Sequence, residues 1–360
     1  MRTGVANLPL HPGKAPRWLF QRMEQLAREM AIILVTEFGT TEFLRRIADP
    51  YWFQATGCVM GFDWHSSGVT TTVNAAFAEG IKGLENELGL YIAGGKGKRS
   101  RQTPAMIESF AGEAGLGTSL AADLVYASRM SAKVDSAALQ DGYQIYQHTF
   151  YFDRSGNWAV VQQGMNERTR YARRYHWLST EVSDFVDEPQ AAICSQVTTT
   201  PLNLVAHESA ETRCMTVDIA CAQPVESLLH DLDRVQSLDM PARHEITPVD
   251  FNRQRLMRII STIREHRPET FERLLGLPGV GPRTIKALAL VSELVYGTKL
   301  SWRDPARYSF AHGGKDGIPF PVDRPTYDQT IETMRWLVGR MKLDRSEAQR
   351  KLKQLELLFD

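Results

Sequence analysis

The sequence predicts an α+β or α/β domain followed by an all-α domain. Three observations lead to this prediction. The chain has 360 residues, more than a single hydrophobic core usually serves. Strand-like alternation of apolar and polar residues occurs before residue 240, whereas from Val249 onward the apolar spacing is helical apart from 298–326. Residues 241–248 contain two prolines and resemble a linker. We therefore expect a mixed domain over 1–240 and a helical domain over 245–360.

The first elements of the mixed domain predict a βαβ unit. Helices are expected over 16–37 and, capped by the threonines that open it, over 40–47. The apolar run at 56–62 predicts a buried strand, which is followed by a helix over 69–88 and a short strand at 90–93. A strand, a helix and a second strand in this order are typical of a βαβ unit.

The middle of the chain predicts helices and then a β-hairpin. A basic, glycine-rich loop at 94–102 leads into helices over 105–140, which begin at a Thr-Pro pair. Alternation at 143–153 and at 158–165, around the turn Arg-Ser-Gly-Asn, predicts two strands of a hairpin. A basic helix is expected over 167–179.

The sequence LLGLPGVGPRTIKALA at 274–289 predicts two helices joined by a tight turn. Gly279 and Gly281 permit the turn, and Pro282 suits the first turn of the second helix. Backbone N–H groups at a helix N-terminus carry partial positive charge and bind phosphate. An ordinary turn between two helices is the alternative. The residues expected to contact a nucleic-acid backbone here are Gly279, Gly281, Arg283 and Thr284.

The pattern Leu-Pro-Gly-Val-Gly-x-Arg-Thr resembles the helix-hairpin-helix motif of DNA repair and recombination proteins. The resemblance implies that the protein binds DNA through its backbone, with little sequence preference. A hairpin that binds phosphates does not distinguish ribose from deoxyribose, so RNA stays an alternative partner. In helix-hairpin-helix glycosylases an aspartate after the hairpin is catalytic, which makes Asp323 a candidate. Two departures are Arg283, where lyase-active members carry lysine, and the long separation between Arg283 and Asp323.

Polar side chains after the apolar run at 56–62 form the first candidate site. Asp63 and His65 can bind a divalent metal, or His65 can act as a general base. Ser66 and Ser67 can hold a phosphate at the start of the next helix. Alternatively, these serines only cap the helix and His65 packs locally.

A second candidate site combines the end of the 105–140 region with the hairpin. Asp135, Asp141 and His148 are metal ligands close together in the sequence. A Mg²⁺-dependent nuclease needs carboxylates around the phosphate and a cation that stabilises developing charge, for which Lys133 is suited. Ion pairs within the fold are the alternative. Two adjacent glutamines, expected to orient a water or a base, are Gln162 and Gln163.

Two basic stretches are expected to contact nucleic acid. Residues 94–101 hold four cations and three glycines but lack the Gly-Lys-Ser/Thr ending of a phosphate-binding Walker loop. In the predicted helix 167–179, three arginines share one face and alternate with aromatic residues. A solvated linker and an ordinary charged helix are the alternatives. The cations concerned are Lys96, Lys98, Arg99, Arg101, Arg170, Arg173 and Arg174.

Composition narrows the class of protein. The formal net charge is zero, so nucleic acid must be bound by local patches. The four cysteines form no C-x-x-C pair, which argues against a zinc ribbon or an iron–sulfur site. No window of 18 apolar residues occurs and the N-terminal stretch lacks a signal-peptide core. We therefore expect a cytoplasmic protein.

Five segments together resemble a prokaryotic family of unknown function, number 763 of the domain-of-unknown-function series. The resemblance spans nearly the whole chain, and DWHSSG and QQGMN are its most specific parts. It implies a role in DNA metabolism and supplies no activity. The segments are LPLHPGKAPRWLF (8–20), WFQATGCVMGFDWHSSGVTTT (52–72), GGKGKRSRQTP (94–104), SRMSAKVDSAALQDGYQIYQHTFYF (128–152) and WAVVQQGMN (158–166).

These observations lead to one main hypothesis and two rivals. The main hypothesis is a DNA-processing enzyme, a structure-specific or single-strand nuclease dependent on Mg²⁺ or Mn²⁺ that acts in repair or recombination. The rivals are a monofunctional DNA glycosylase that uses Asp323 and a DNA-binding adaptor without catalytic activity. The predicted metal ligands are Asp63, His65, Asp135, Asp141 and His148.

Overall fold

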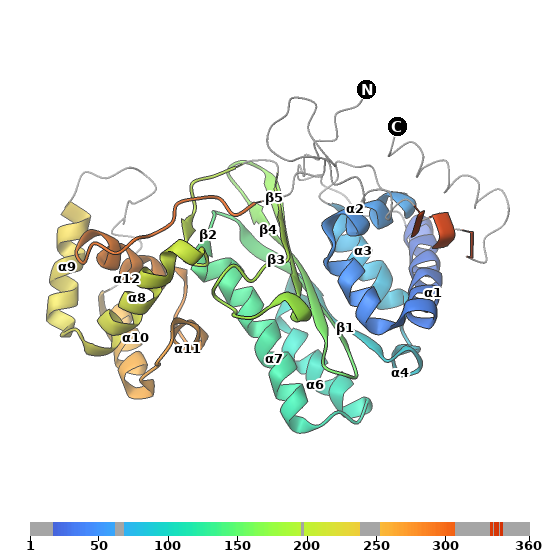
Figure 1. The fold of residues 1–360 in the computed structure, drawn as a ribbon, viewed down its shortest axis with the longest axis horizontal. Coiled ribbons are helices and arrows are strands. Elements are labelled where there is room, and N and C mark those ends of the chain that lie inside the picture. Colours follow the sequence, from blue (N-terminus) through green and yellow to red (C-terminus); the bar gives the residue numbers. More distant parts are fainter. Residues whose placement is uncertain are drawn as a thin grey trace.

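The computed structural model describes residues 17–61, 68–195, 198–237 and 253–306, and within 332–340 a few further residues: 332–333, 335–337 and 339–340. Figure 1 shows the arrangement of its elements. The helices are α1 (Arg17–Ala48), α2 (Pro50–Val59), α3 (Gly68–Gly80), α4 (Glu85–Leu88), α5 (Lys98–Arg101), α6 (Thr103–Glu113), α7 (Thr118–Lys133), α8 (Ala210–Ala222), α9 (Val225–Ser237), α10 (Arg253–His266), α11 (Phe271–Gly276) and α12 (Pro282–Leu294). The strands are β1 (Leu90–Lys96), β2 (Leu139–Gln140), β3 (Gln144–Asp153), β4 (Trp158–Asn166), β5 (Tyr171–Leu178), β6 (Ala192–Cys194) and β7 (Leu202–Asn203). A π-helical turn, η1 (Val134–Ala138), continues α7, and short 3₁₀ helices are η2 (Ser179–Glu181) and η3 (His207–Ser209).

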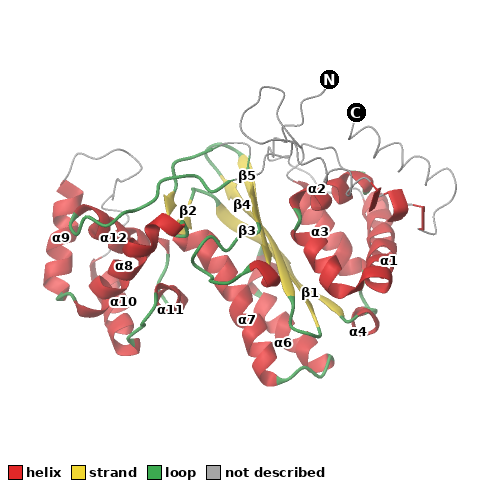
Figure 2. Ribbon diagram, viewed as in Figure 1, coloured by secondary structure: helices red, strands yellow, loops and turns green. Residues whose placement is uncertain are grey.

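A five-stranded antiparallel sheet lies at the centre of the fold, in the order β1-β3-β4-β5-β6. Helices cover both of its faces (Figure 2). Successive side chains of a strand point to opposite faces. Phe150 and Phe152 therefore pack with α6 and α7 in one core, whereas Tyr151 packs with α1, α2 and α3 in another. The strands predicted at 143–153 and 158–165 are confirmed as the hairpin β3–β4.

The predicted βαβ unit is wrong. The run expected as a strand at 56–62 belongs mainly to α2, and β1 pairs antiparallel with β3. A short apolar run is buried equally well as a strand or as a helix, so its length alone does not decide. The decisive signals were Asp49, whose carboxylate caps α2 by accepting from the amides of Tyr51 and Trp52, and Pro50 in the first turn.

The basic helix predicted over 167–179 is also wrong, because residues 171–178 form β5. Within a strand, neighbouring residues face opposite ways, so Arg173 and Arg174 do not share a face. Both are fully buried, with none of their surface exposed. They therefore offer nothing to a nucleic acid at the surface and pair with groups inside the protein. Alternating burial could not reveal β5, since seven of its eight residues are buried.

The helices α8 to α12 gather at one end of the molecule (Figure 1). Their apolar residues, among them Ile260 and Leu288, belong to the same core cluster as Phe150 of the sheet. The predicted boundary near residues 240–245 lies outside the described residues. Among the helices of the described residues, none combines the length and the apolar character that a membrane span requires.

Candidate nucleic-acid interface

The turn between α11 and α12 places backbone amides at the start of a 13-residue helix. Thr270 caps α11 by accepting from the amide of Arg273, 3.2 Å away. Gly279 has φ of 83°, a left-handed conformation that strongly favours glycine. Val280 is buried and anchors the turn, and Gly281 is the N-cap of α12 without any side-chain cap of its own. The two helices predicted at this position are confirmed.

The ammonium group of Lys133, at the end of α7, holds this turn from inside. Lys133 Nζ donates to the carbonyl oxygens of Leu275, Leu277 and Val280, at 2.6, 2.8 and 3.2 Å. In a trans peptide the C=O and the following N–H point in opposite directions. Because the Val280 carbonyl points at Lys133, the Gly281 N–H points away from it. Among the described residues no acceptor lies against that N–H.

Lys133 therefore has a different environment from the one predicted. It was expected to stabilise charge on a phosphate, but its three donor positions face carbonyl oxygens of the protein. Burial lowers its pKa. Gln140 adds a second link to the same turn, since its Nε2 donates to the carbonyl of Pro282 at 2.8 Å. Lys133 and Gln140 therefore both position the turn between α11 and α12.

Behind the turn between α11 and α12, four buried side chains form one chain of hydrogen bonds. Gln162 Nε2 donates to Asp135 Oδ2 and, at 3.1 Å, to the Ser131 carbonyl, so its Oε1 must face His148. Since Oε1 only accepts, His148 Nδ1, 2.8 Å away, carries the proton. His148 Nε2 then accepts from the Ser128 hydroxyl at 2.9 Å. Burial lowers the pKa of His148 to about 4, which keeps the ring neutral near pH 7.

Asp135 ends this chain and accepts from two further donors. Trp177 Nε1 lies 2.8 Å from Oδ2, and Gln190 Nε2 lies 2.6 Å from Oδ1. Burial raises the pKa of Asp135 to about 7, although the three donors favour its charged form. These partners come from β4, β5 and the segment before β6. The network thus ties η1 to the sheet.

Asp141 belongs to a second buried cluster, centred on Arg173. The Arg173 guanidinium donates to Asp141 at 3.0 Å and to both oxygens of Asp304, at 3.1 and 2.8 Å. Asp141 also accepts from the Tyr175 hydroxyl at 2.7 Å. Burial raises the pKa of Asp141. Arg173 therefore joins the sheet to a segment 131 residues further along the chain.

The described residues do not bring the predicted metal ligands together. In these ranges no group of three or more His, Cys, Asp or Glu side chains could hold a metal ion. Asp135, Asp141 and His148 instead hydrogen-bond to protein groups in two networks, and among the described residues they form no such group. The other two predicted ligands, Asp63 and His65, lie outside the described residues, as does Asp323. A metal site that includes them stays a prediction.

The remaining predicted residues are dispersed. Gln163 is buried and its Nε2 donates to the Tyr146 hydroxyl, on the other side of the pleat from Gln162. Arg174 lies against the Phe53 ring, 4.7 Å from its centroid, and bonds to Gln54. Arg170 is exposed, in a left-handed turn. Thr284, in the first turn of α12, is buried. The exposed cations around α5 are Lys96, Lys98, Arg99 and Arg101.

Sequence reasoning missed three members of the two networks. Trp177, Gln190 and Asp304 are separated from their partners by 42, 55 and 131 residues. No local pattern marks such contacts. A buried carboxylate needs donors, but the sequence does not say which strands will supply them.

The pKa of Asp135 gives a testable pH dependence. Its pKa is higher in the folded protein, about 7, than its ordinary value of 3.8, so its contribution to stability is present below pH 3.8 and is lost as the pH rises through 7. Between pH 5 and pH 8 the wild type should lose roughly 3 kcal/mol relative to Asp135→Asn, measured by urea unfolding of both proteins. His148 is present in both and cancels. A pH-independent difference would contradict the raised pKa.

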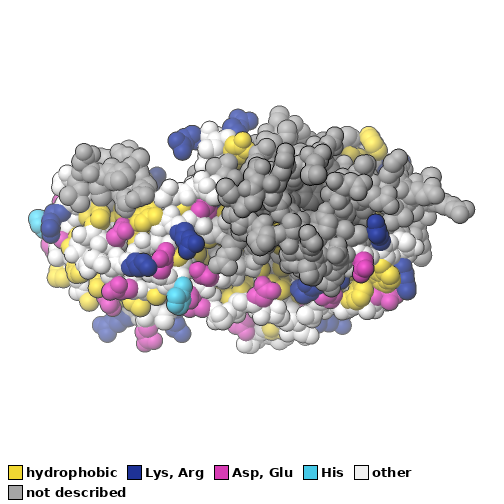
Figure 3. All heavy atoms as spheres, turned by 45° about the horizontal axis from the view of Figure 1, so that its top comes forward, with side chains coloured by type: hydrophobic (Ala, Val, Ile, Leu, Met, Phe, Trp, Pro, Cys, Tyr) yellow, Lys and Arg dark blue, Asp and Glu magenta, His cyan; other side chains and the backbone are white. Residues whose placement is uncertain are grey.

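Charged side chains on the surface are mixed. On the face drawn in Figure 3, lysines and arginines are interspersed with aspartates and glutamates. This agrees with the formal net charge of zero. A phosphate site on this protein therefore depends on local geometry more than on a broad positive field.

The chain matches the model of a known protein family. The model of one family, described as a protein of unknown function (DUF763), matches residues 4–322. No curated protein and no solved structure matches the chain.

Proposed function

Since this chain belongs to the DUF763 family, described as of unknown function, we propose its function from the site: it binds the phosphate backbone of DNA at the turn between α11 and α12. The observation that carries the proposal is the orientation of the turn. Lys133 gathers three carbonyls on the inner side, which leaves the Gly281 amide at the positive end of α12 directed outward.

The proposal is supported by what surrounds that amide. Gly281 carries no side chain, and a Cβ placed there would meet nothing within 4 Å, so a phosphate oxygen can approach the backbone. Arg283 is exposed one residue into α12 and supplies a full positive charge. The backbone amide and the guanidinium are both suited to phosphate and neither contacts a base edge, so the binding is expected to be independent of sequence.

The predicted enzymatic activities remain predictions. Two of the five ligands named in the nuclease hypothesis, with Mg²⁺ or Mn²⁺, are Asp63 and His65, and the glycosylase hypothesis depends on Asp323. All three lie outside the described residues. Asp135, Asp141 and His148 give a metal no support, because their oxygen and nitrogen atoms bond to protein groups. The geometry therefore favours binding over cleavage by those residues.

A titration with labelled DNA tests the proposal. Duplexes of two unrelated sequences are titrated with the protein at several salt concentrations. We expect equal affinities for both, with log K falling linearly as log salt rises, at a slope of about 0.9 per phosphate contacted. Affinity that is absent at low salt, or that differs strongly between the sequences, would contradict it. Parallel incubations with Mg²⁺, with Mn²⁺ and with EDTA show whether the DNA is also cut.

A further inference from the structure

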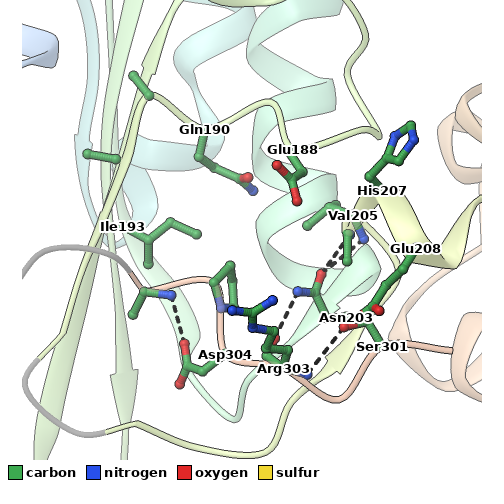
Figure 4. Close-up of a pocket in the computed structure, with 15 residues that line it drawn as sticks. Glu188, Gln190, Ile193, Asn203, Val205, His207, Glu208, Ser301, Arg303 and Asp304 are labelled. Carbon is green, nitrogen blue, oxygen red and sulfur yellow. Dashed lines mark hydrogen bonds between the residues drawn. The ribbon is translucent and has the colours of Figure 1, made fainter. Parts of the chain in front are cut away.

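A pocket of about 610 Å³ opens beside the buried Asp135 network. It lies between β6, β7, η3 and the segment 301–306 (Figure 4). Its volume is typical of sites that bind small ligands. One wall is apolar, formed by Ala192, Ile193 and Val205, all of them buried. Such a wall suits a flat, weakly polar group.

Arg303 supplies the cation of this pocket. The neighbouring carboxylates already have cationic partners, since Glu208 pairs with Lys299 at 2.9 Å and Asp304 with Arg173 at 2.8 Å. Among the described residues the Arg303 guanidinium makes no hydrogen bond or close ion pair, although its charge acts on Glu208 from further away, and Figure 4 shows its side chain within the pocket. A guanidinium in this setting suits a phosphate, which it can bind with two parallel hydrogen bonds.

Hydrogen-bond acceptors lie on the side of the pocket opposite Arg303. Gln190 Nε2 donates to Asp135 Oδ1 at 2.6 Å, so the Oε1 of the same amide is directed away from that oxygen. Glu188 adds a carboxylate that lines the same side of the pocket (Figure 4). The Gln190 Oε1 matches the exocyclic amino group of cytosine, adenine or guanine, whereas the O4 carbonyl of uracil at the same place is itself an acceptor.

We infer that this pocket binds a nucleotide whose base carries an amino group, with the phosphate at Arg303 and the base against Ile193 near Gln190. The inference deepens the proposed function, on which it rests for the source of the nucleotide: the end, or an extruded base, of the strand held at the hairpin. One segment connects the two places. Lys133 holds the hairpin, Asp135 holds Gln190, and β2 pairs with β7 at the pocket wall.

Calorimetric titration with mononucleotides tests the inference. CMP and UMP differ only at the Watson–Crick edge of the base, in the group at position 4 and in the proton on N3, so they are the matched pair of ligands, and inorganic phosphate is the control for phosphate alone. We expect CMP to bind about tenfold more tightly than UMP. Arg303→Gln should weaken CMP about tenfold, while Arg129→Gln, at an exposed arginine of α7, should change nothing.

The outcomes separate the two proposals. Equal affinity for CMP, UMP and inorganic phosphate, or the same loss in both arginine variants, would overturn the pocket. Arg303 is exposed and makes no close side-chain contact with a partner among the described residues beyond its charge interaction with Glu208, so its variant should fold, and its thermal unfolding checks this. If CMP fails to bind while duplex DNA binds at the hairpin, only the pocket inference falls. If CMP binds and DNA does not, the proposed function falls.

Discussion

Replacement of Arg173 by leucine should lower the free energy of unfolding by roughly 3–5 kcal/mol. Arg173 is fully buried between Asp141 and Asp304, and it is the cation that both carboxylates contact. Leucine would fill part of the volume but leave two buried carboxylates without their cation, and an uncompensated buried charge is costly. Urea unfolding at pH 7 measures the loss.

Arg168→Leu is the matched control, because Arg168 is exposed and precedes the same strand. We expect it to change stability by less than about 0.5 kcal/mol. A second test follows from the chemistry of carboxylates. Protonation removes the uncompensated charge, so the loss in Arg173→Leu should shrink as the pH falls toward 5. A loss that is small, or the same in both variants, would mean that the Arg173 cluster does not join the two parts of the fold.

Local signals in the sequence predict the elements whose borders are chemically marked. The hairpin β3–β4 shows alternation around a tight turn, and α12 begins at a Gly-Pro pair. The first two predicted helices also occur, merged in α1 with a break at Gly39, where φ is 84°. In each case neighbouring residues determine the structure.

The strand β5, predicted as a helix, is fixed by distant contacts. Arg173 and Arg174 read as surface residues because arginine is seldom buried. Their partners, Asp304 and Gln54, are 131 and 120 residues away. Burial on both faces is a second reason why β5 is not predicted. A strand that is covered on both sides does not alternate between apolar and polar residues.

The sequence predicts only part of the candidate site, because the rest depends on contacts between residues that are distant in the sequence. Gly279 and Gly281 were identified from their local pattern, which backbone conformation dictates. The role of Lys133 was not, because its three acceptors lie 142 to 147 residues further along the chain. Lysine beside aspartate in a sequence suits both a metal site and a structural contact, and only the fold distinguishes them.

The second large effect is expected from Gly281→Asp. Gly281 has φ of −145°, an extended conformation that any residue adopts, and its Cβ position is open. Aspartate is among the preferred N-cap residues, so α12 should be as stable as before or slightly more so. Its carboxylate would occupy the amides of the first turn and repel phosphate. DNA affinity should therefore fall about tenfold or more.

Gly117→Asp is the matched control for this change. Gly117 is the N-cap of α7, also has no side-chain cap, and has an equally open Cβ position. It lies at the other end of a helix of 16 residues from Lys133, which places it about 24 Å away. Both variants add the same charge at the same kind of position, so a general effect of charge would appear equally in both.

The affinity of the two variants for one labelled duplex, measured at the same low salt, tests the central claim most directly. The account predicts that Gly281→Asp loses binding while Gly117→Asp binds as the wild type does, with neither unfolding at a lower temperature. Wild-type affinity in Gly281→Asp would contradict the claim that the turn between α11 and α12 holds the DNA backbone.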